Sequence, residues 1–142
     1  MRRFSMCCLI VLLLLSTISF SSADSPSISN NQIHMDAESG NCAFHWYYDI
    51  DFFDAEGKVL NTYGHSRKEV NNRHNEAYDV PSAAATMTIK VGAHAGGSHT
   101  WTNVPAQAAA FLCKGWLASS AQVQYKFKNG GSGSYSLNAG NE

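Results

Sequence analysis

Residues 42–53 read Cys-Ala-Phe-His-Trp-Tyr-Tyr-Asp-Ile-Asp-Phe-Phe and carry the clearest structural signal in the chain. Every second residue of this stretch is apolar or aromatic, and the residues between them include His45, Asp49 and Asp51. A period of two over about ten residues is typical of a β-strand with one buried face and one wetter face. The stretch therefore predicts a long strand in a mostly β fold.

Shorter alternating segments follow it along the chain. Four of them are predicted as further strands: Lys58–Tyr63, Thr86–Val91, Gln122–Lys128 and Tyr135–Leu137. Several short strands separated by turn signals favour a small antiparallel β-sandwich. Residues 105–114 fit either one short helix, because Pro105 opens an alanine-rich run that ends at Gly115, or another strand.

The N-terminus has the order of a secretory signal peptide. Arg2 and Arg3 precede an unbroken apolar run at Met6–Leu15, and Ser21-Ser22-Ala23 supplies small residues for cleavage. The run is shorter than the roughly 20 residues that a transmembrane helix needs. We therefore expect a signal peptide at 1–23, an extended N-terminal arm at 24–40 that suits one edge strand, and a β-sandwich domain at 41–142 of a secreted protein.

The net charge of the exported chain limits which partners it can bind. Without Arg2 and Arg3, eight basic residues remain against eleven acids, which leaves a net charge of −3. No basic stripe is present to hold phosphates by general electrostatics, so a nucleic-acid partner is not expected, and an anionic membrane surface is disfavoured.

The cysteine count predicts a single disulfide. Cys7 and Cys8 lie inside the apolar leader, which leaves Cys42 and Cys113 in the exported chain. An even pair of cysteines in a secreted protein indicates a structural bond. The two residues lie 71 positions apart, so the bond would close most of the domain. A loop of that length corresponds to about 4 kcal/mol of stabilisation in the chain-entropy model.

Two groups of residues suggest metal ions, although each is incomplete. His94 and His99 flank a glycine-rich loop and could both reach Zn²⁺, but the sequence nearby supplies no third or fourth ligand. Asp49, Asp51 and Asp54 could supply carboxylate oxygens to Ca²⁺, which needs six to eight oxygen ligands. We expect no cofactor, with these two ions as the alternatives.

Aromatic residues point to binding instead. Trp101 and Trp116 stand among Gly, Ser, Thr and Asn in a context typical of loops. Aromatic rings beside amides and hydroxyls suit carbohydrate stacking or protein recognition. We expect the recognition surface on the loops Gly64–Asp79 and His94–Trp101, because binding residues concentrate on loops held by a rigid scaffold. Besides the two tryptophans, the predicted contacts are Arg73, His74, His94 and His99.

These observations favour a secreted, non-enzymatic protein that recognises a glycan or a cell-surface protein, in an effector or defence-type role. No catalytic residue is assigned, because Gly97-Ser98-His99 is not a GxSxG nucleophile elbow. A membrane-active pore-forming toxin and a metal-dependent hydrolase are the alternatives. Because Trp101 is predicted to lie in a loop, we expect the substitution Trp101→Ala to leave the melting temperature of the protein nearly unchanged.

Overall fold

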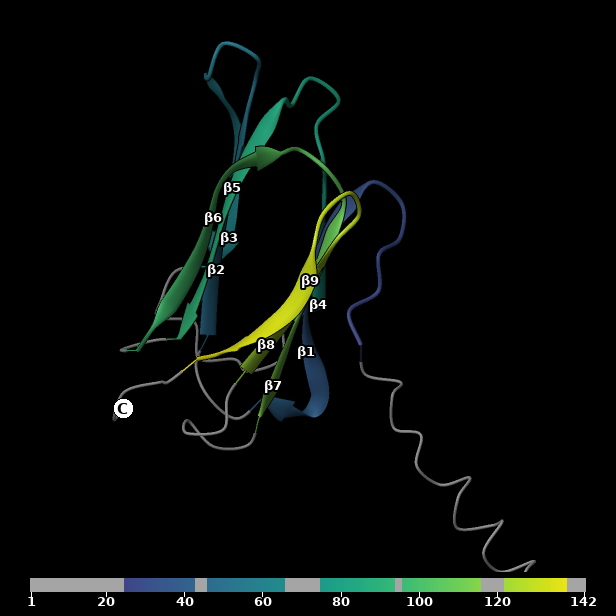
Figure 1. Cartoon of the computed structure of the whole chain (residues 1–142), viewed down its shortest axis with the longest axis vertical. Helices are drawn as coiled ribbons and strands as arrows, with labels where there is room; N and C mark the ends of the chain where they lie inside the picture. Colours follow the sequence, from purple (N-terminus) through teal and green to yellow (C-terminus); the bar gives the residue numbers. More distant parts are fainter. Residues whose placement is uncertain (1–24, 43–45, 66–74, 94–95, 116–121, 138–142) are drawn as a thin grey trace, which may run out of the picture.

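A computed structural model describes residues 25–42, 46–65, 75–93, 96–115 and 122–137. These residues form nine strands in two sheets that pack face to face, and none of them is helical (Figure 1). The strands are β1 (Gln32–Cys42), β2 (Trp46–Phe53), β3 (Val59–His65), β4 (Asn75–Asp79), β5 (Thr86–Ala93), β6 (Ser98–Pro105), β7 (Ala109–Gly115), β8 (Gln122–Phe127) and β9 (Ser132–Ser136). The mostly β prediction is confirmed, and the arrangement is consistent with a small β-sandwich.

The large sheet has the order β4-β1-β7-β8-β9, and the small sheet has the order β3-β2-β5-β6. All neighbouring strands are antiparallel except β1 and β7, which run parallel. The expected edge strand near the N-terminus is instead an interior strand, because β1 pairs with β4 on one side and with β7 on the other. It also crosses the boundary expected at residue 40.

The alternation in residues 46–53 sets the core, as predicted. Trp46, Tyr48, Ile50 and Phe52 are buried on the inner face of β2, whereas Asp49 is exposed on its outer face. The other strands contribute buried inner-face residues that include Ile33, Met35, Met87, Ile89, Val91, Phe111, Cys113 and Val123. Burial of these apolar side chains between the sheets is the main stabilising contribution to the fold.

Residues 105–114 form no helix, so that option is wrong. They comprise the end of β6, a short connection and most of β7. Residues 109–113 are all buried, including Ala110 and Leu112 on the outer face of the large sheet. A strand that is buried on both faces has a continuous apolar run rather than an alternating one. This is why the segment lacked the period of two.

A β-bulge interrupts β6. Met87 lies opposite Val104 and Ile89 lies opposite Trp101, so Thr88 faces two residues of β6 instead of one. Asn103, one of these two, has φ 54° and donates its backbone N–H to the Thr88 hydroxyl at 3.3 Å. Because the bulge adds one residue, Trp101 and Val104 both sit opposite inward-facing residues although they are three positions apart.

Candidate binding site

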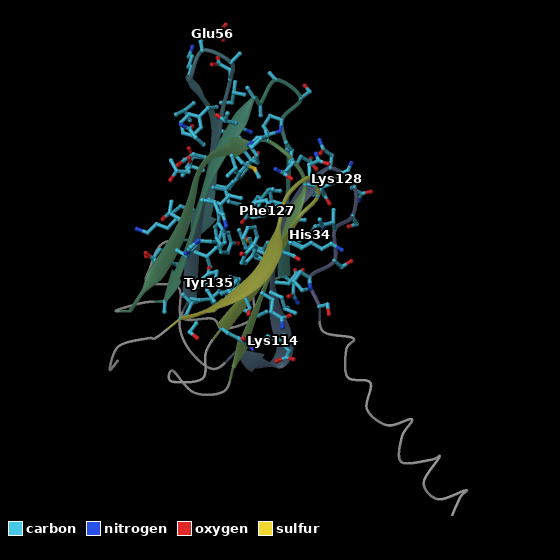
Figure 2. All side chains as sticks on the ribbon, in the orientation of Figure 1. His34, Glu56, Lys114, Phe127, Lys128 and Tyr135 are labelled. Atoms are coloured by element: carbon cyan, nitrogen blue, oxygen red, sulfur yellow. The ribbon has the colours of Figure 1, made fainter. Side chains whose placement is uncertain are left out.

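Trp101 lies at the centre of an aromatic cluster that joins the two sheets. It belongs to β6 rather than to a loop, which corrects the placement expected from the sequence. Its ring centroid lies 5.0 Å from that of Tyr125, 5.2 Å from Phe111 and 5.6 Å from Tyr135. Phe127 and Tyr135 point from the large sheet into the space between the sheets (Figure 2).

A pocket of about 270 Å³ opens beside this cluster. Its apolar walls are Trp101, Val104, Pro105, Tyr125 and Phe127, and its polar side is formed by Gln107, Asn129, Gly130 and Gly131. The walls come from β6 and β8, the edge strand of one sheet and an interior strand of the other. The bulge in β6 is therefore what allows Trp101 and Val104 to line the same pocket.

A buried amide fixes the polar side of the pocket. The side chain of Gln107 donates from Nε2 to the Pro105 carbonyl at 2.9 Å, and its Oε1 accepts the backbone N–H of Asn129 at 2.6 Å. These bonds hold the turn between β8 and β9 against the connection between β6 and β7. At Gly130 a Cβ atom would lie 3.2 Å from Cβ of Phe127, so glycine allows the close approach of the turn.

The lining determines what the pocket can hold. None of the described residues around it is Asp, Glu, His, Lys or Arg. It offers two kinds of group instead: the faces and edges of aromatic rings, and the amides of Asn129 and the glycine backbone. Such a combination suits a neutral ligand with one apolar face and several hydroxyl or amide groups.

His99 extends the cluster to the surface. Its exposed ring lies 4.4 Å from the centroid of Trp101 and 4.9 Å from that of Tyr135, so it joins β6 to β9. The Tyr135 hydroxyl is buried and has no hydrogen-bond partner among the described residues. This burial raises the pKa of Tyr135. The cluster is thus held mainly by ring packing rather than by polar contacts.

Two of the three acidic residues considered for calcium have other contacts. Asp49 is exposed, and Asp51 Oδ1 accepts the hydroxyl of Thr62 at 2.8 Å. Asp54 Oδ1 accepts two backbone N–H groups of its own turn, from Glu56 at 2.9 Å and from Lys58 at 2.8 Å. Within the described ranges, no three His, Cys, Asp or Glu side chains gather as metal ligands would. Calcium and zinc binding stay predictions.

Several predicted contacts cannot be placed. Arg73, His74, His94 and Trp116 lie outside the described residues. The loop expected at Gly64–Asp79 is shorter than predicted, because β3 extends to His65 and β4 begins at Asn75.

A polar cluster around Glu76 on β4 was not predicted from the sequence. The hydroxyl of Tyr48 donates to Glu76 Oε2 at 2.6 Å and lies 2.9 Å from the hydroxyl of Tyr78, which donates to the same carboxylate oxygen. Tyr63 stacks on Tyr78 at 4.7 Å. Burial, followed by the bond to Glu76, raises the pKa of Tyr78 to about 12, and the same two causes raise that of Tyr48.

This tyrosine–glutamate cluster ties the small sheet to the edge strand β4 of the large sheet. Asn75–Asp79 alternates exposed and half-buried positions in the structure, but its polar composition gave no period of two in the sequence from which the strand could be predicted.

Comparison with protein families, curated proteins and solved structures finds no match to this chain. No helix in the part of the chain that the structure describes is long and apolar enough to cross a membrane.

Proposed function

We propose that the protein is a secreted, non-enzymatic binding protein and that the pocket between β6 and β8 recognises a neutral sugar unit of a glycan. The observation that carries this proposal is the pairing of aromatic walls at Trp101 and Tyr125 with a fixed amide side at Gln107 and Asn129. Sugar rings present an apolar face of C–H groups and a rim of hydroxyls, which match these two sides of the pocket.

Size and rigidity support the same ligand class. The volume of about 270 Å³ lies just below the range of roughly 300–1,000 Å³ for drug-sized ligands. It therefore suits one ring rather than an extended molecule. The apolar walls belong to the strands β6 and β8, and the hydrogen bonds of Gln107 hold the polar side in place. A site that is ordered before binding loses less conformational entropy when the ligand enters.

Export and a disulfide between Cys42 and Cys113 form part of the proposal. The leader sequence at 1–23 supports export. The two cysteines lie on neighbouring strands, because β1 pairs with β7 and Cys42 lies opposite Gly115, two residues beyond Cys113. Cys113 is fully buried in the core, where a disulfide would be protected from reductants.

Binding of the mature protein to an array of neutral and charged glycans tests the proposal, followed by calorimetric titration of the best neutral oligosaccharide. Asn129→Ala should weaken binding roughly two- to tenfold, the range for one lost neutral hydrogen bond. The backbone bond from Asn129 to Gln107 is kept in this variant. Asn61→Ala, an exposed asparagine on β3 at the opposite edge of the small sheet, is the matched control. Absence of glycan binding, or an equal effect of both substitutions, would contradict the proposal.

A further inference from the structure

A second cleft, of about 360 Å³, lies on the outer face of the large sheet. Its floor is formed by β8 and β9, and the N-terminal segment at Ser25 and Pro26 forms one side. The outward-facing residues of the two strands pair across it, with Gln124 opposite Ser134 and Lys126 opposite Ser132.

The polar groups of this cleft are hydroxyls, an amide and one ammonium group. Besides Lys126, the polar side chains that line it are Ser25, Gln124, Ser132 and Ser134. No carboxylate lines it among the described residues. All of these groups can donate hydrogen bonds, and only the lysine carries a charge.

Lys126 forms no ion pair with any described residue. Lys114 on the neighbouring strand differs, because its ammonium group lies 3.7 Å from the carboxylate of Glu38. Across the sheet from Lys126, the next outward positions are Ala110 on β7 and His34 on β1, neither of which is acidic. No acidic side chain thus stands in the cross-strand row of Lys126, and Asp36, which lies in the row of Gln124, stands two strands away from β8 on β1.

From this geometry we infer that the cleft binds an anionic oxygen group, a carboxylate or a sulfate ester, carried by the same glycan that the aromatic pocket recognises. The inference rests on the proposed function for its ligand. Lys126 supplies the charge, and Ser132, Ser134 and Gln124 donate hydrogen bonds to the oxygens. A charge-assisted hydrogen bond is stronger than a neutral one, so the anionic group is favoured over a hydroxyl.

The position of Tyr125 connects the two sites, because this residue lines both the cleft and the aromatic pocket. Opposite it on β9 stands Gly133, where a Cβ atom would lie 2.9 Å from the Tyr125 hydroxyl. The ring of Tyr125 therefore packs over Gly133 and covers the inner face of the last strand at this level. The pocket lies on the inner side of the large sheet and the cleft on its outer side, so an oligosaccharide that contacts both has to pass around the edge strand β9.

The test compares a neutral trisaccharide that binds the pocket with the same trisaccharide carrying a C6 carboxylate or a C6 sulfate, and adds inorganic sulfate alone. Lys126→Gln is the test variant. Lys128→Gln is the control, because it removes the same charge from an exposed lysine that follows β8 directly (labelled in Figure 2) and does not line the cleft. Binding is followed by calorimetry and by backbone amide chemical shifts.

We expect the acidic trisaccharides to bind about 1.5- to fivefold more tightly than the neutral one, the range for an exposed ion pair. Lys126→Gln should remove this preference without changing the affinity for the neutral trisaccharide, and Lys128→Gln should retain it. Equal affinity for neutral and acidic sugars, or equal effects of the two variants, would overturn the inference and leave the proposed function intact.

Inorganic sulfate separates the remaining cases. If no saccharide binds, but sulfate shifts the amides of Gln124 and Ser134 in the wild type and not in Lys126→Gln, then the proposed function fails and the anion site stands. If sulfate also causes no shift, both proposals are refuted.

Discussion

Replacement of Trp101 by alanine should destabilise the fold, in contrast to the expectation from its sequence context. The indole packs edge-to-face on Phe111, which is fully buried, and on Phe127 at 5.8 Å. Truncation of a buried Phe or Trp costs about 3–5 kcal/mol. Because Trp101 is only partly buried, we expect a loss of unfolding free energy at the lower end of this range, about 3 kcal/mol. At about 4 °C per kcal/mol, the melting temperature of a domain of this size should fall by roughly 12 °C.

Thermal unfolding followed by circular dichroism measures this effect on the oxidised mature protein. Trp101→Phe is the informative second variant, because it keeps a ring against Phe111 and should recover more than half of the loss. A decrease of less than about 3 °C for Trp101→Ala, below 1 kcal/mol on the same scale, would refute the reasoning. The indole would then be a surface group whose ring contacts contribute little to the core.

Three further results are expected. Asn103→Val should lower the free energy of unfolding by about 1–2 kcal/mol, because a β-branched residue tolerates φ of 54° poorly. Asn103→Gly should leave the free energy of unfolding nearly unchanged, and equal effects of the two substitutions in denaturant titrations would contradict this prediction. The contribution of Tyr48 and Tyr78 to stability should be constant below about pH 10 and decrease from there toward pH 12, because the unfolded chain releases the phenolic proton of Tyr78 first; Tyr48→Phe should reduce that decrease, and unfolding that is unaffected by alkali would contradict it. Reduction of the proposed Cys42–Cys113 bond should lower stability by about 4 kcal/mol, and thiol titration that finds both sulfurs free would exclude the bond.

The period of two in the sequence was sufficient to predict β2, β5 and β8, because each of these strands has one buried face and one more polar face. The same reasoning failed for β7, whose residues 109–113 are buried on both faces and so resemble a short apolar helix. Periodicity also failed to predict β4, because its inward-facing residues, Glu76 and Tyr78, carry polar groups. Periodicity detects strands with chemically different faces and misses those whose faces are alike.

The candidate site was predictable only in part. The residue type of Trp101 and the nearby amides suggested recognition, but the position of its ring depends on one extra residue in β6 and on partners from β7, β8 and β9. No local pattern encodes such contacts. Gln107 was also missed, because its role follows from a bond to Asn129 that lies 22 positions away.

The position of β1 has a consequence for biosynthesis. Both of its hydrogen-bonded neighbours, Asn75–Asp79 and Ala109–Gly115, are translated after it, and the second begins 109 − 42 = 67 positions beyond the end of β1. β1 can therefore pair along one edge once β4 has been translated, but its other edge stays unpaired until β7 has emerged. Chains with pairings this distant fold slowly, since much of the entropy of loop closure is lost before the contacts form. Ribosome-bound or truncated chains that stop before Ala109 should thus remain targets for chaperones and proteases.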